Sequence, residues 1–144
     1  MAKKFEGKKI LVVDDDQDIV TAIIAALDDF GAQIKTAGDG NTAVQMIQQE
    51  VPDLLILDQM LPGRSGFLVM ERIRPLRKEP SRLPVIMITA NPGARHKAYA
   101  QTLGVDAYLN KPFRMDKLVT AARELLETGK ISQPPQPPQP PKKP

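Results

Sequence analysis

The chain has 144 residues, a formal net charge of +3, no cysteine and one histidine, His96, so disulfides, thiolate metal sites and multi-histidine metal sites are excluded. Its length suits one domain with a single core, and no apolar run reaches the roughly 20 residues of a transmembrane helix. The excess of positive charge lies near the two ends rather than inside the chain, and no signal-peptide core is present, so we expect a soluble cytoplasmic protein that binds neither nucleic acid nor membranes.

The first predicted strand is an apolar, β-branched run over residues 10–13 that ends on three consecutive acids at 14–16. Apolar residues then recur at helical spacing as far as Phe30, and Gly31 is a suitable helix stop. This order, a buried strand followed by a helix, is the first of several such units.

The central stretch of the chain is a second, stronger apolar run. A short strand over 33–36 and a helix over 41–49 precede it. Residues 54–57 are all large and apolar, which is typical of a parallel strand buried on both faces. The run ends on Asp58 and is followed by a loop that contains Pro62-Gly63.

The remaining elements alternate in the same way. The pattern predicts a helix over 67–73, a strand over 84–89, a weaker helix over 94–103, a strand over 107–109 and a helix over 115–127. Five strand–helix units predict an α/β fold, a parallel sheet with helices on both faces. Right-handed crossovers place all strand ends along one edge of that sheet, and that edge carries Asp14, Asp15, Asp58, Thr89 and Lys111.

The clustered residues are suited to phosphoryl chemistry. Converging carboxylates repel one another unless a cation neutralises them, and hard oxygen ligands without sulfur favour Mg²⁺ over zinc. An ammonium from Lys111 and a hydroxyl from Thr89 then complete a site for a phosphoryl group, with Asp58 as a candidate nucleophile. The alternative is that these acids only cap helices or start turns and that the lysine is solvated.

Four motifs in chain order carry a family resemblance. They are Val12-Val13-Asp14-Asp15, Leu57-Asp58-Gln59-Met60-Leu61-Pro62-Gly63, Ile88-Thr89-Ala90 and Tyr108-Leu109-Asn110-Lys111-Pro112-Phe113. Over residues 8–127 the chain resembles the receiver domain of two-component response regulators. The resemblance implies a flavodoxin-like, doubly wound (βα)5 fold with strand order 2-1-3-4-5.

The resemblance also implies a role for each residue of the cluster. Asp58 would be the phosphoacceptor, and Asp14 and Asp15 would be the acidic pair that places Mg²⁺, together with Asp58 and the backbone carbonyl of Met60. Lys111 would contact the phosphoryl group. The protein would then be a phosphorelay switch, not an enzyme beyond its own phosphorylation and dephosphorylation, with a sensor histidine kinase or phosphotransfer protein as donor.

The switch itself would use two further residues. Thr89 would bond a phosphoryl oxygen, and Tyr108 would be the aromatic whose inward rotation reports phosphorylation to the surface of the fourth helix, fifth strand and fifth helix. The resemblance also implies a cis bond before Pro112. We expect a monomer or weak dimer, with the downstream target left open.

The chain departs from the family pattern at a few positions. Ser65 stands where an acid often precedes Gly66, which we expect to affect the loop more than the chemistry. Met60 and Asn91 occupy the two positions whose side chains tune phosphoryl lifetime in the family, so the sequence leaves that lifetime open.

The same residues allow two other interpretations of function. A receiver-like binding module that is never phosphorylated would share the fold, but it would tolerate loss of the acids, Thr89 and Lys111. A hydrolase using an aspartyl-phosphate would need a further acid/base and enclosing segments.

Residues 128–144, rich in Pro and Gln, predict a disordered tail or linker that adds nothing to folding, with recruitment of a proline-binding partner as the alternative.

Overall fold

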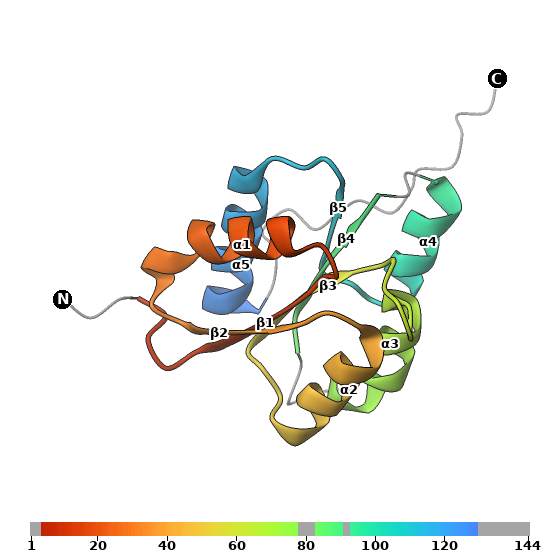
Figure 1. The fold of residues 1–144 in the computed structure, drawn as a ribbon, viewed down its shortest axis with the longest axis horizontal. Helices are drawn as coiled ribbons and strands as arrows, with labels where there is room; N and C mark the ends of the chain where they lie inside the picture. The colour runs from red at the N-terminus through yellow and green to blue at the C-terminus, as the bar shows by residue number, and fades with distance from the viewer. Residues whose placement is uncertain (1–3, 78–82, 91–92, 130–144) are drawn as a thin grey trace.

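The computed structural model describes residues 4–77, 83–90 and 93–129, which form one layered α/β unit (Figure 1). Asn91 and residues 130–144 of the Pro/Gln-rich segment lie outside the described residues. The elements, in chain order, are β1 (Lys9–Val13), α1 (Gln17–Ala26), η1 (Asp28–Phe30), β2 (Gln33–Ala37), α2 (Gly40–Gln49), β3 (Leu54–Asp58), α3 (Gly66–Arg72), η2 (Arg74–Arg77), β4 (Val85–Thr89), α4 (Ala94–Thr102), β5 (Ala107–Asn110) and α5 (Met115–Thr128).

The five strands form one parallel sheet in the order β2-β1-β3-β4-β5. This confirms both the predicted fold class and the predicted strand order. β3 lies at the centre, where Leu57 pairs with Val13 on one side and with Met87 on the other. Every residue of β3 is buried, because helices cover both faces of the sheet.

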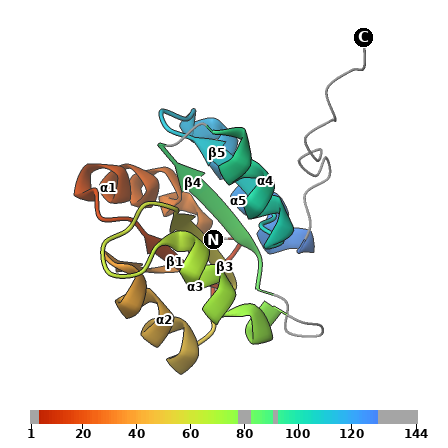
Figure 2. The ribbon, with the colours of Figure 1, turned by 90° about the vertical axis from the view of Figure 1, so that its right-hand side faces the viewer.

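Two apolar cores lie on opposite faces of the sheet. α1 and α5 pack on one face through residues such as Ile23 and Leu118, while α2, α3 and α4 pack on the other (Figures 1 and 2). Alternate residues of β3 serve the two cores: Leu54 and Ile56 point to the α1/α5 side, Leu55 and Leu57 to the other. The continuous apolar run in the sequence is thus explained by burial on both faces.

The predicted helices are confirmed, with two short 3-10 segments in addition. The first predicted helix leaves α-geometry after Ala26 and continues as η1, which ends at Gly31 in the left-handed region, φ 78°. There Phe30 is buried against Phe5, with ring centroids 5.0 Å apart. α3 gives way to η2 beside Pro75, a residue that cannot donate a helical hydrogen bond and disfavours α-geometry before it.

α4 is the least embedded helix. Among its described side chains only Ala100 is buried, and its N-cap, Gly93, provides no side-chain hydrogen bond. Its other end is held by Arg77, whose guanidinium donates to the carbonyls of Leu103 and Gly104 at 3.2 and 2.8 Å. Phe67 also packs against the rings of His96 and Tyr99, so α4 is held by Arg77 and by aromatic contacts as well as by burial of Ala100.

Among the residues that the structure describes, no helix has the length and apolar character needed to span a bilayer.

Candidate functional site

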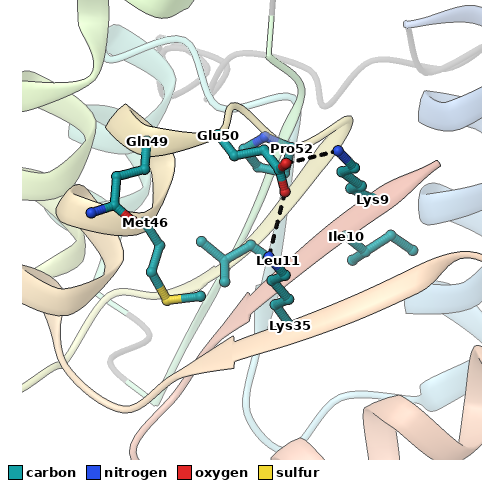
Figure 3. A pocket seen from close by; sticks show the side chains of 8 residues that line it. All are labelled: Lys9, Ile10, Leu11, Lys35, Met46, Gln49, Glu50 and Pro52. Atoms are coloured by element: carbon teal, nitrogen blue, oxygen red, sulfur yellow. Dashed lines mark hydrogen bonds and ion pairs between the residues drawn. The ribbon is translucent and has the colours of Figure 1, made fainter. Parts of the chain in front are cut away.

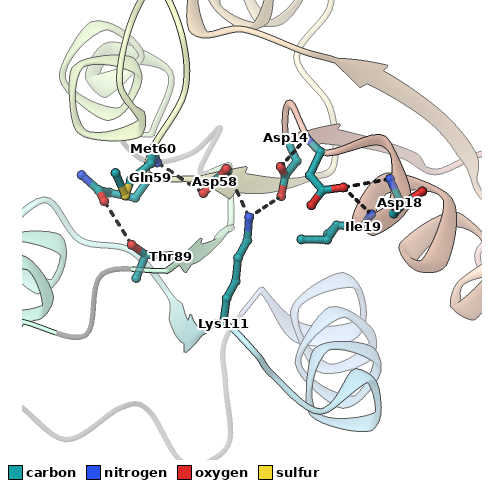
Figure 4. Close-up of polar contacts among 9 residues, drawn as sticks. Asp14, Asp18, Ile19, Asp58, Gln59, Met60, Thr89 and Lys111 are labelled. Carbon is teal, nitrogen blue, oxygen red and sulfur yellow. Dashed lines mark hydrogen bonds and ion pairs between the residues drawn. The ribbon is translucent and has the colours of Figure 1, made fainter.

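The predicted cluster forms at the carboxyl ends of the strands, where open α/β sheets carry their ligands. Asp14 and Asp15 follow β1 directly, Asp58 ends β3 and Lys111 follows β5. Figure 4 shows Asp14, Asp58 and Lys111 pointing toward one another. One carboxylate oxygen from each of the three acids lies within 4.8 Å of the others. The structure therefore brings together residues that are up to 97 positions apart in the sequence.

The three acids that follow β1 have different roles. Asp14 is fully buried, and its Oδ1 accepts a hydrogen bond from the backbone N–H of Asp16 at 2.9 Å. Asp15 is exposed and faces the cluster. Asp16 is the N-cap of α1, where its Oδ1 accepts from the backbone N–H groups of Asp18 and Ile19. Only the first two acids thus belong to the site.

Lys111 connects the two buried acids. Its Nζ lies 3.0 Å from Asp14 Oδ2 and donates to Asp58 Oδ2 at 3.4 Å. The Asp14 contact is an ion pair that lacks the geometry of a directed hydrogen bond. The Lys111 backbone N–H donates to Thr89 O at 2.7 Å, and the Lys111–Pro112 peptide is cis, as the resemblance implied. The ammonium is therefore positioned from β4 as well as from β5.

Burial and like charge set the protonation of the site. Burial raises the pKa of Asp58 to about 6, aided by the neighbouring Asp14 carboxylate and opposed by Lys111 and the Met60 N–H. Burial by itself lowers the pKa of the Lys111 ammonium, but its contacts with Asp14 and Asp58 outweigh that effect and leave the pKa raised. The metal-free site thus holds more negative charge than one lysine neutralises.

The donor set fits a hard divalent cation. Three carboxylates converge, Asp14 Oδ2 is buried with only an ion-pair contact, and neither sulfur nor imidazole is part of the group. Oxygen ligands of this kind are those that Mg²⁺ takes. Met60, the further predicted ligand, has a side chain that is 55% exposed, and its backbone N–H donates to Asp58 Oδ1 at 3.3 Å.

Thr89 is fully buried at the end of β4, and its hydroxyl donates to Gln59 Oε1 at 3.0 Å. Tyr108 lies on β5 and is half-buried, and among the described residues its hydroxyl has no hydrogen bond of standard geometry. Burial raises the pKa of the Tyr108 phenol, and the nearby Thr89 hydroxyl offsets part of the rise. Gln59 is thus a site residue that the sequence analysis missed.

The loop after Asp58 is held against the site by a glycine. A Cβ added to Gly66 would lie 2.5 Å from the Asp58 carbonyl oxygen and 2.8 Å from the Gln59 Cα. The absence of a side chain therefore lets α3 begin directly on the backbone of the acceptor strand. Ser65 caps this helix, because its Oγ accepts from the Leu68 N–H at 3.3 Å, which agrees with its expected role in the loop.

The surface of the described residues includes a hollow at each end of the sheet. One, of about 100 Å³, is at the opposite edge of the sheet, where Lys9 and Lys35 both pair with Glu50 (Figure 3). The other, of about 450 Å³, lies beside the acidic cluster. It is lined by Asp18, Ile19, Ala22, Lys111, Pro112, Phe113 and Met115. This larger hollow adjoins the site, and the smaller one does not.

Comparisons with known proteins agree with this geometry. The family model described as "Response regulator receiver domain" matches residues 10–123. The alkaline phosphatase synthesis transcriptional regulatory protein PhoP of Bacillus subtilis (strain 168) is 36% identical over 128 residues, which are 89% of this chain and 52% of that protein. The chain thus spans about half the length of this curated relative.

Solved structures give the same result. The receiver domain of the Francisella response regulator 1452 has a TM-score of 0.75 and 31% identity, covering 86% of this chain and all of that one. A structure described as the BeF3-activated receiver domain of DrrB, a Thermotoga maritima protein, has a TM-score of 0.74 and 28% identity. It covers 83% of this chain and 97% of that chain.

Proposed function

The chain belongs to the receiver-domain family of two-component response regulators, and we propose that it is a phosphorelay switch whose phosphoacceptor is Asp58. Receiver domains are signalling domains. The observation that carries the assignment of Asp58 is its place at the end of the central strand, next to Asp14 and 3.4 Å from the Lys111 ammonium. Its proposed donor is the phosphohistidine of a sensor kinase or phosphotransfer protein in the cytoplasm.

The transfer exchanges one bond to phosphorus for another. An Asp58 carboxylate oxygen attacks the phosphorus, the P–O bond forms and the donor's P–N bond breaks. The imidazole nitrogen leaves with the electron pair and takes up a proton. Lys111 stabilises the charge on the phosphoryl oxygens in both the transition state and the product. In dephosphorylation a water oxygen attacks the phosphorus, the bond from phosphorus to the Asp58 oxygen breaks, inorganic phosphate leaves and the Asp58 carboxylate is restored.

A magnesium ion is the proposed cofactor. Asp14, Asp15 and Asp58 would hold it, with the Met60 carbonyl as a further ligand, and it would neutralise charge on the phosphoryl oxygens. The three convergent carboxylates support this assignment.

We expect Asp15→Ala to weaken Mg²⁺ binding at least about tenfold, because it removes one of the few charged oxygen ligands. Since Asp15 is exposed, the fold should be intact, and loss of like charge beside Asp14 should leave the metal-free protein as stable or more stable. Isothermal titration with MgCl₂ measures the affinity. Asp29→Ala, a change of an exposed acid in η1, is the matched control. Equal affinities of Asp15→Ala and wild type would refute the proposed metal site.

The hollow beside the cluster is a suitable docking place for the phosphodonor. It is open and mostly apolar, formed by α1 and the segment before α5, and Lys111 forms part of its wall. A helical donor domain with an apolar face would bring its phosphohistidine to Asp58 from this side. Ile19→Glu is the change that would block such docking without touching the acids.

Small phosphodonors test the function directly. Incubation with Mg²⁺ and an acyl phosphate should add the mass of one phosphoryl group to the intact protein. The rival interpretation, a receiver-like module that binds partners without phosphorylation, predicts an unmodified chain. It is disfavoured because the acids and Lys111 are all present and in contact. The hydrolase interpretation would need a further general acid/base, and the titratable groups beside Asp58 in the described site, Asp14, Asp15 and Lys111, are those proposed to hold the metal and the phosphoryl group.

The proposed output is a change of the α4-β5-α5 surface, coupled through Thr89. A hydroxyl beside a dianionic phosphoryl group gains a charge-assisted hydrogen bond, and movement of Thr89 would leave space for the Tyr108 ring. Thr89→Ala should therefore still be phosphorylated but should lose most of the amide shift changes over residues 93–129. NMR spectra of wild type and Thr89→Ala, each with and without phosphorylation, measure this. Identical shift changes in the two proteins would exclude Thr89 as the coupling residue.

A further inference from the structure

Gln59 makes a buried side-chain contact that the proposed chemistry does not use. Gln59 follows Asp58 directly and is only 8% exposed. Its Oε1 accepts a hydrogen bond from the Thr89 hydroxyl at 3.0 Å (Figure 4). Thr89 itself is fully buried, so water cannot readily replace this bond. A buried hydroxyl–amide pair of this kind costs more to break than an exposed one.

The backbone fixes where the Gln59 side chain begins. Its N–H donates to Ile88 O on β4 at 2.8 Å, and its carbonyl accepts from the Gly66 N–H at 2.9 Å. α3 also approaches within van der Waals range, since a Cβ on Gly66 would lie 2.8 Å from the Gln59 Cα. The Gln59–Thr89 hydrogen bond can therefore break by rotation of either side chain, whereas the Gln59 backbone stays in place.

The threonine hydroxyl carries one proton and donates to one acceptor at a time. In the unphosphorylated protein that acceptor is Gln59 Oε1. A phosphoryl oxygen on Asp58 would compete for the same proton. We propose that Gln59 is a positioning residue that holds the Thr89 hydroxyl in its resting direction, so that activation requires exchange of the Gln59–Thr89 hydrogen bond for one to the phosphoryl group. This inference rests on the proposed phosphoacceptor function of Asp58.

The exchange sets how readily the switch turns on. Any free energy held in the Gln59–Thr89 bond stabilises the resting state and is lost in the active one. The apparent affinity for a phosphoryl mimic falls by the same factor as the population of the active state. A neutral buried hydrogen bond contributes about 0.5–1.5 kcal/mol, which corresponds to a factor of about 2–13. Gln59 would thus tune the resting balance of this chain.

Gln59→Met removes the acceptor and keeps the length of the side chain. We expect this variant, with Mg²⁺ present, to bind beryllofluoride about 2–10-fold more tightly than wild type. Without beryllofluoride, its amide signals over 93–129 should shift toward the positions of the beryllofluoride-bound wild type. If Gln59 only stabilised the fold, its substitution would change the melting temperature without shifting these amide signals toward their positions in the beryllofluoride-bound wild type. Gln59→Leu repeats the test should the methionine variant fold poorly.

A double-mutant cycle ties the effect to Thr89. Thr89→Val keeps the shape and removes the hydroxyl, so it should itself weaken beryllofluoride binding. In that background Gln59→Met should change the affinity by less than twofold, because the bond it would break no longer exists. Gln49→Met, the same change at an exposed position of α2, controls for the substitution.

The outcomes separate this inference from the proposed function. Wild type that binds no beryllofluoride and accepts no phosphoryl group would overturn the phosphoacceptor assignment. Wild type that binds it, with Gln59→Met and Gln59→Leu binding equally or more weakly, would overturn only the role of Gln59. An equal effect of Gln59→Met in the wild-type and Thr89→Val backgrounds would also overturn it, since the effect would then not pass through the threonine hydroxyl.

Discussion

Asp58→Asn is expected to abolish phosphorylation of the protein while leaving its fold intact. The amide of asparagine cannot attack phosphorus as a carboxylate does, yet it has nearly the same shape. Its single oxygen can keep one of the two hydrogen bonds that Asp58 accepts, from the Met60 N–H at Oδ1 or from Lys111 at Oδ2. Intact mass after incubation with Mg²⁺ and an acyl phosphate should show one added phosphoryl group on wild type and none on the variant. Asp29→Asn, a change at an exposed acid in η1, should be labelled like wild type.

The same substitution should stabilise the metal-free protein in a pH-dependent way. Burial, then the Asp14 charge, raise the pKa of Asp58 from 3.8 to about 6. The folded state therefore binds this proton more tightly than the unfolded chain, so ionisation costs stability as the pH rises from about 4 to 6. Above pH 6 the Asn variant should gain about 1–3 kcal/mol over wild type, and near pH 4 the gain should vanish.

Urea unfolding in EDTA at pH 4.5 and 7.5 measures this difference. Full labelling of Asp58→Asn at another residue would refute the acceptor assignment, whereas a stability difference that is independent of pH would refute only the electrostatic argument. The two measurements are independent because labelling requires Mg²⁺, whereas unfolding is measured in EDTA without it.

The strand ends could be predicted because each buried strand has a clear sequence pattern. The apolar run 54–57 can be identified as a buried parallel strand because the other predicted strands alternate with helices. A parallel sheet then places the residues that follow each strand at one edge. The positions of Asp14, Asp58 and Lys111 follow from topology alone. No knowledge of side-chain packing was needed for them.

The Gln59–Thr89 contact depends on strand register instead. Asp58 pairs with Ile88, which brings the two residues that follow them, Gln59 and Thr89, side by side. An apolar run shows that a strand exists but not which residue of the neighbouring strand it faces. A glutamine after an acid also carries no signal of its own, because such residues are common in loops. The Arg77–Asp106 contact, between residues 29 positions apart, was hidden for the same reason.

Arg77→Met is expected to lower the free energy of unfolding by about 3–5 kcal/mol, because it removes the guanidinium that pairs with the buried Asp106 carboxylate. The Arg77 and Asp106 side chains are 9% and 6% exposed, and their ion pair measures 3.0 Å. Arg77 also donates to the Leu83 carbonyl at 2.9 Å, while Asp106 accepts from the Val85 N–H at 2.8 Å. The pair thus joins η2 to the starts of β4 and β5.

An exposed pair provides the matched control. Arg114 and Asp116 also form an ion pair, at 2.9 Å, but their side chains are 75% and 64% exposed. Arg114→Met should therefore cost less than about 1 kcal/mol. The double variant Arg77→Met/Asp106→Asn should be more stable than the sum of the two single changes predicts. Equal losses for Arg77→Met and Arg114→Met would show that burial does not strengthen the first pair.

Arg77 lies away from the acidic cluster, so an effect of its substitution on stability can be distinguished from an effect on phosphorylation. It lies at the edge of the sheet where β4 and β5 begin, opposite the acids, and it holds the carbonyls at the end of α4. Below its melting temperature, Arg77→Met should still be labelled at Asp58, since none of the residues around the acceptor contacts Arg77 among the described interactions. Its α4 amides should exchange faster with solvent, because the substitution removes the hydrogen bonds that Arg77 donates to the carbonyls at the end of this helix. Slow labelling together with unchanged amide exchange would instead place Arg77 in the path between the acceptor and α4.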